Sequence, residues 1–111
     1  MGDVIQFSTN VLVERKRLLD RAKKIRGIAG RVESAANSYL LHACGVAARA
    51  NYVGFSINAP NTGAPEEALR YCRAARRYYQ ATDRILDLAT KIEVRAGVKH
   101  CVKSRSPNGA A

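Results

Sequence analysis

The sequence predicts an all-α fold because apolar side chains recur every seven residues along most of the chain. Large apolar residues hold this interval from Val4 to Val53, and alanines hold it from Ala22 to Ala50. The two series interleave at spacings of four and three, which places both on one face of a helix. Because no proline interrupts it, this stretch predicts one long helix over residues 4–53.

A second segment carries the same two series and predicts a helix over residues 65–96. Its large residues at the seven-residue interval are Tyr71, Tyr78, Ile85 and Ile92. Its small residues at that interval are Ala68, Ala75, Thr82, Ala89 and Ala96. Pro65 suits the first turn of a helix, and Gly97 suits the position just after its end.

Paired stripes of alanine and large apolar residues also predict how the two helices pack. Alanine lets two helix axes approach closely, and the larger side chains fill the space alongside. The expected fold class is all-α: an antiparallel helical hairpin or a three- or four-helix bundle, with alanine-rich, heptad-like packing, and oligomerisation is one way to complete it. Gly27 and Gly30 leave a break near 27–30 open, because a glycine in a helix costs about 1 kcal/mol relative to alanine. The heptad phase passes through both without a slip, which favours continuity.

The length of 111 residues predicts a single helical domain at residues 1–96. Glycine, proline and asparagine gather between the helices and predict a loop over residues 54–64. Residues 97–111 lack apolar periodicity and are expected to form a flexible basic tail. A chain of this size folds alone only marginally, so we expect it to associate with itself or with a protein partner.

The net charge of +10, from 19 basic and 9 acidic residues, points to a polyanionic partner. A folded, strongly basic small protein most often meets RNA, DNA or an acidic protein surface. The alternative is a charge that only prevents aggregation. Residues 1–7 lack the basic start of a signal peptide, and no stretch has the ~18 uncharged apolar residues of a membrane helix. We therefore expect a cytoplasmic protein with no role at a membrane.

Basic residues repeat at the heptad interval, each one position before a large apolar residue, as in Arg70, Arg77 and Arg84. Seven residues of helix advance ~10.5 Å, so such a row meets roughly every second phosphate of one strand. The alternative is a solvated helix face with ion pairs such as Glu14 with Arg17. The expected nucleic-acid-binding residues are Arg17, Arg21, Lys24, Arg31, Arg70, Arg73, Arg76, Arg77, Arg84 and Lys91.

Three tyrosines lie among these arginines and are expected to pack rather than to stack on bases. Tyr71 and Tyr78 fall on the series of large core residues, and Tyr79 borders it. Their hydroxyl groups are expected to reach the edge of the helix interface, where they can find a hydrogen-bond partner.

No constellation of residues in the sequence supports an enzyme. The start of the second helix explains Glu66 and Glu67, because acids favour the positive end of a helix dipole. The sequence lacks the Glu-x-x-His repeats of di-iron bundles and the glycine loops that hold phosphates. We expect no catalytic residue, cofactor, metal or small-molecule substrate. Cys44 and Cys72 reach the same level of a hairpin, where two small core thiols are expected and a zinc or redox pair stays open.

In size, charge and helicity the chain is similar to two groups of small basic proteins. One group is the helix-bundle accessory proteins beside reverse transcriptases in diversity-generating retroelements, and the other is the small helical subunits of CRISPR effector complexes. The resemblance carries over no site residue. The expected function is that of a non-enzymatic accessory protein that binds the backbone of RNA or DNA through arginine-rich helix faces. The alternatives are a helical interaction or assembly module without a nucleic-acid role, and a small regulator such as an antitoxin or anti-activator.

Overall fold

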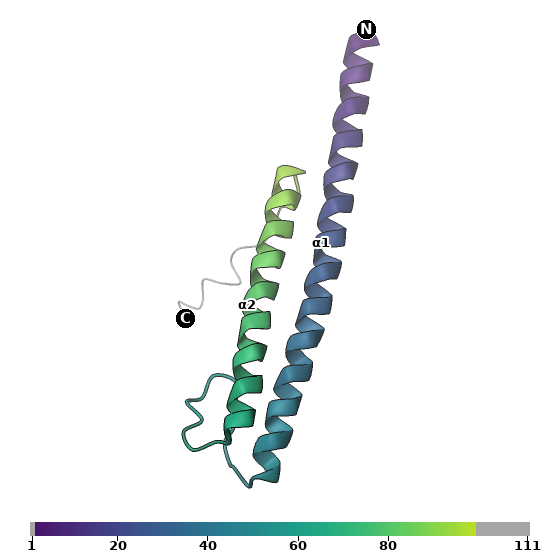
Figure 1. The fold of residues 1–111 in the computed structure, drawn as a ribbon. Coiled ribbons are helices and arrows are strands. Elements are labelled where there is room, and N and C mark those ends of the chain that lie inside the picture. Colours follow the sequence, from purple (N-terminus) through teal and green to yellow (C-terminus); the bar gives the residue numbers. More distant parts are fainter. Residues whose placement is uncertain (1, 100–111) are drawn as a thin grey trace, which may run out of the picture. The chain divides into compact units, whose positions relative to one another are not determined.

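The structure, a computed structural model, describes the backbone of residues 2–99 and the side chains of residues 10–99. Two helices, α1 at Gly2–Arg49 and α2 at Glu66–Arg95, pack against each other (Figure 1). The prediction of an all-α chain with two long packed helices is confirmed, since no described residue lies in a strand. The expected flexible tail lies, from residue 100 onward, outside the described residues. Contacts divide the chain into two compact units, Met1–Ile25 with Asp87–Ala111, and Arg26–Leu86.

The first helix passes through Gly27 and Gly30 without a break, so the continuous alternative is the correct one. A Cβ built on either glycine would meet nothing within 4 Å, and no close contact therefore explains why glycine stands there. Ala29, between them, is buried. Packing of the alanine stripe stabilises the helix across this point and offsets the poor helix propensity of the two glycines.

The first helix ends at Arg49 rather than near residue 53, because Asn51 adopts a left-handed conformation with φ of 59°. The Tyr52 N–H donates to the Ala47 carbonyl at 2.9 Å, which closes the helix in the manner of a Schellman cap. Val53, which continues the heptad count in the sequence, is therefore outside the helix and 90% exposed.

The second helix begins with Glu66 and Glu67 in its first turn and ends at Arg95. Gly97 follows with φ of 93°, and the Val98 N–H donates to the Glu93 carbonyl at 2.9 Å. Only glycine adopts this left-handed conformation without a steric penalty, which explains why the helix stops where the sequence places Gly97.

In the unit made of residues 1–25 and 87–111, the two helix segments run antiparallel. Ala22 packs with Ala89 and Ile92, and Leu18 and Ile25 cover this cluster from the sides. The Arg15 Nε–H donates to the carbonyl of Ala96, near the end of α2, at 3.1 Å. The alanine stripe thus forms the close contact between helices that its spacing predicts.

In the unit made of residues 26–86, alanine also forms the seam between α1 and α2. Fully buried alanines in this unit are Ala29, Ala36, Ala43, Ala47, Ala68 and Ala75. Val46 joins Ala47 and Ala68 in a cluster that Tyr52 and Phe55 of the connecting segment cover. Most of the larger heptad residues are only half-buried. Small residues in the seam bring the axes together and leave the bulkier side chains at its edges.

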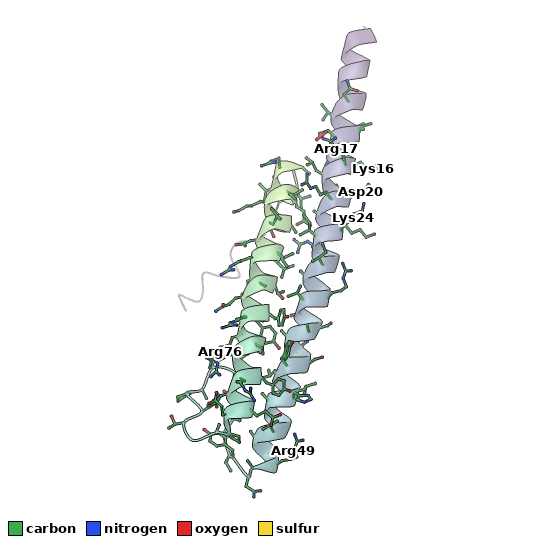
Figure 2. All side chains as sticks on the ribbon, viewed as in Figure 1. Lys16, Arg17, Asp20, Lys24, Arg49 and Arg76 are labelled. Carbon is green, nitrogen blue, oxygen red and sulfur yellow. The ribbon has the colours of Figure 1, made fainter. Side chains whose placement is uncertain are left out.

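The segment between the helices, residues 50–65, is organised around the buried side chain of Asn61. Its carbonyl oxygen accepts from the Ser56 N–H at 3.2 Å, and its amide donates to the Ser56 carbonyl at 2.9 Å. Arg76 of α2 reaches this segment (Figure 2) and donates to the carbonyls of Ile57 at 2.8 Å and Ala59 at 3.5 Å. The segment is therefore fastened along one edge of α2.

Candidate nucleic-acid interface

All eight basic residues of the unit 26–86 are arginines, and four acids accompany them. Arg70, Arg77 and Arg84 form a row on α2 at seven-residue steps. All three side chains are exposed. None of them makes a hydrogen bond or ion pair with any residue that the structure describes. The row therefore keeps its guanidinium groups available for a ligand.

A ladder of aromatic rings lies beside this arginine row. Tyr39 of α1 inserts between Tyr71 and Tyr78 of α2, with ring centroids 6.1 Å and 5.3 Å away and interplanar angles of 30° and 7°. One ring fits there because residues seven apart on a helix are separated by ~10.5 Å along the axis. The ring of His42 continues the ladder, 4.6 Å from Tyr71 at a tilt of 55°.

The ladder and the arginines form one surface, and we call it the tyrosine face. Arg70 lines a groove of about 270 Å³ together with Tyr39, Tyr71 and Ala74. A second groove, of about 370 Å³, lies beside His42 and Arg49. Arg77 and Arg84 lie on the same side of α2 as Arg70, because residues seven apart share one helix face. The tyrosine face consists of Tyr39, His42, Arg49, Arg70, Tyr71, Arg77, Tyr78 and Arg84.

The other edge of α2 in this unit is occupied by the connecting segment. The Cys72 thiol and the Arg76 guanidinium both donate to the Ile57 carbonyl, the thiol at 3.9 Å. Nearby, the Tyr79 hydroxyl donates to the side-chain carbonyl of Asn37. Since this segment packs along the edge that carries Cys72, Arg76 and Tyr79, it leaves the row of Arg70 and Arg77 uncovered.

Tyr39, the central ring of the ladder, remains uncharged at neutral pH because its pKa is raised. The charge of a Tyr78 phenolate, and after it a side-chain hydrogen bond with Tyr78 that favours the neutral Tyr39 phenol, raise the pKa of Tyr39 above the ordinary value of 10.0. A neutral phenol does not repel a polyanion, whereas a phenolate would. The Tyr39 ring can therefore lie beside phosphate groups without opposing the arginines.

The ten predicted binding residues form three groups, according to whether they already have a partner and which unit carries them. Arg73 pairs with Glu66 at 3.0 Å, and Arg76 holds the connecting segment, so these two guanidinium groups already have partners. Arg31, Arg70, Arg77 and Arg84 are exposed residues of the unit 26–86. Arg17, Arg21, Lys24 and Lys91 are exposed residues of the other unit.

In that other unit, Arg17 makes an ion pair with Glu14 at 2.8 Å. This pair belongs to the solvated-face alternative that the sequence allows. Figure 2 shows Lys16, Asp20 and Lys24 along the side of α1 that points away from α2 in this unit. None of the residues of this unit whose side chains the structure describes, 10–25 and 87–99, is aromatic, so these basic residues have no ring of their own unit beside them.

Sequence reasoning missed Tyr39, His42 and Arg49, and it placed Tyr78 in the core. Tyr78 is 38% exposed, because close approach of the helices at the small seam residues leaves its ring at the edge. His42 and Arg49 are seven residues apart, and this spacing is the signal in the sequence that places them on one side of the helix.

The described part of the chain holds no metal site and no membrane span. Cys44 and Cys72 are free thiols, and no three metal-binding side chains of the described residues come together. Neither helix, as far as it is described, has an apolar stretch long enough to cross a membrane. Comparisons with protein families, curated proteins and solved structures find no match to this chain.

Proposed function

We propose that this chain is a cytoplasmic, non-enzymatic accessory protein that binds RNA or DNA through the arginines of its tyrosine face. It acts within a larger ribonucleoprotein or a complex of the reverse-transcriptase or nuclease type. The observation that carries the proposal is the row of Arg70, Arg77 and Arg84, which is exposed and has no described acid partner. Because one helix carries all three arginines, their attachment points along α2 have a fixed spacing.

Arginine suits this role chemically. Its planar guanidinium donates two parallel hydrogen bonds to a phosphate, and it stays charged at every physiological pH. The unit that carries the tyrosine face has arginine at each of its eight basic positions and no lysine. Steps of ~10.5 Å along the row suit phosphate contacts, which position a strand without reading its sequence.

Exchanging Arg70, Arg77 and Arg84 together for glutamine is expected to weaken binding of a labelled oligonucleotide at least about tenfold near 100 mM salt. Fluorescence anisotropy measures this loss at salt concentrations between about 50 and about 300 mM. Because each phosphate contact releases condensed counterions, the slope of log affinity against log salt should fall by roughly two to three. Circular dichroism checks that the helices persist.

The matched control exchanges Arg17, Arg21 and Lys24 for glutamine, which removes the same charge from the other unit. We expect a clearly smaller loss in this variant, because the arginines of the tyrosine face remain. Equal losses in the two variants would mean that overall charge, rather than the tyrosine face, attracts the nucleic acid. Salt-insensitive binding, or none, would refute the proposal.

A second candidate function is an assembly module completed by further copies of the chain. Three consecutive apolar residues of α1, Val11, Leu12 and Val13, are exposed, and Leu12 and Val13 are 65% and 62% accessible. Runs of exposed apolar residues favour contact with another protein. Light scattering that gives a defined multiple of 12.1 kDa, reduced to one copy by Leu12→Glu, would support this candidate. A single-copy mass at micromolar concentration would exclude self-assembly.

A further inference from the structure

Tyr78 is an aromatic residue on a basic surface, and it is partly exposed. One described ring, that of Tyr39, stacks on it in a nearly parallel arrangement with an interplanar angle of 7°. The residue is nevertheless 38% exposed, although it stands at a heptad position where the pattern predicts a core residue. A planar, apolar group from a ligand can therefore contact the exposed part of Tyr78.

The groove of about 270 Å³ beside the ladder also brings aromatic rings and a cation together. Tyr39 and Tyr71 supply ring surfaces, Arg70 supplies a cation, and Ala74 between them is too small to fill the space. Arg77 precedes Tyr78 in the chain as Arg70 precedes Tyr71, so each α2 tyrosine of the ladder has an exposed arginine on its outer side. An arginine beside a tyrosine therefore recurs after seven residues along α2.

A nucleic-acid duplex cannot use this arrangement fully. Its bases are stacked on each other inside the helix, and a protein surface of this kind meets only its phosphates. In a single strand, the bases are free to turn outward and stack on aromatic side chains, while the phosphates meet basic groups. Stacking tolerates any base, because every base has a π face.

We propose that the tyrosine face binds single-stranded nucleic acid, with unpaired bases against Tyr78 and the groove of Tyr39 and Tyr71. The phosphates of the strand then lie on Arg70, Arg77 and Arg84. This inference rests on the proposed nucleic-acid binding and specifies its substrate class. It follows that the bases themselves contribute to affinity, in addition to the charge of the backbone.

The test compares three probes of about 12 nucleotides, within the range of single-strand binding sites. They are oligothymidylate, an abasic strand with the same number of phosphates, and a duplex of equal length. The full chain is expected to bind oligothymidylate at least about tenfold more tightly than the abasic strand, because stacking contributes about 5-fold to about 150-fold per base. The chain contains no tryptophan, so quenching of tyrosine fluorescence reports the stacking directly.

Two substitutions at one position separate the ring from its hydroxyl group. Tyr78→Leu should lower affinity for oligothymidylate by about 5-fold or more and leave affinity for the abasic strand unchanged. Tyr78→Phe keeps the ring and should keep the wild-type affinity. Since Tyr78 is partly exposed, neither variant is expected to unfold, and circular dichroism verifies this.

The outcomes distinguish base stacking from the proposed nucleic-acid binding on which it rests. Equal binding of oligothymidylate and the abasic strand, with no effect of Tyr78→Leu, would overturn base stacking and leave arginine–phosphate binding in place. Tighter binding of the duplex would overturn the inference in the same way. If none of the probes binds, the proposed function itself fails.

Discussion

Replacing Ala36 with leucine is expected to destabilise the protein by roughly 1–3 kcal/mol, since Ala36 lies at the close contact between α1 and α2. Its side chain is 0% exposed, and other alanines of the same seam are equally buried. Leucine adds three carbon atoms where the helix axes have approached to the limit that alanine allows. The helices must move apart, which loosens contacts along the seam. Urea denaturation followed by circular dichroism measures the change in unfolding free energy.

The matched control is Ala48→Leu, at an exposed position near the end of the same helix. Alanine and leucine both have high helix propensity, so Ala48→Leu should change the free energy of unfolding by no more than about 0.5 kcal/mol. A similar loss at both positions would show that leucine harms α1 generally. No loss at Ala36 would show that the alanine seam is not close-packed.

Replacing Asn61 with alanine is expected to cost about 2–3 kcal/mol, mostly through the segment that connects the helices. The change removes both hydrogen bonds to Ser56. It also places alanine at φ of 52°, a left-handed conformation that asparagine tolerates better than alanine does. Chemical denaturation measures the total loss, and limited proteolysis at residues 50–65 locates it.

Two further substitutions at this position separate the causes. Asn61→Gly also loses the hydrogen bonds but relieves the backbone strain, so it should be less destabilising than Asn61→Ala. Asn61→Asp keeps an acceptor for the Ser56 N–H and loses the donor to the Ser56 carbonyl. If all three variants matched the wild type, the connecting segment would not depend on the Asn61 side chain.

Much of the fold was predictable because alanine at heptad positions has a simple physical meaning. Ala22, Ala36, Ala75 and Ala89 could be assigned to the helix contact from spacing alone, and all are buried. The end of α1 was harder to predict, because Val53 continues the heptad count while Asn51 stops the helix two residues earlier. A cap formed by one asparagine overrides an apolar pattern, since the chain cannot stay helical through a left-handed residue.

The candidate site was predictable only in part. The row of Arg70, Arg77 and Arg84 follows from helical spacing, because one period fixes the relative direction of residues on one helix. The tyrosine ladder joins residues from both helices, and their alignment depends on how far one helix is displaced along the other. That displacement is determined by tertiary packing, and the sequence pattern alone does not predict which ring Tyr39 meets.

A nuclear magnetic resonance titration of the labelled protein with oligothymidylate tests the tyrosine face most directly. Signals of the Tyr39, Tyr71 and Tyr78 rings and of the Arg70 and Arg77 guanidinium groups are expected to shift together, in proportion to the bound fraction. Signals of residues in the other unit should change little. Shifts confined to Val11–Val13, or no shift at saturating oligonucleotide, would contradict binding at this surface.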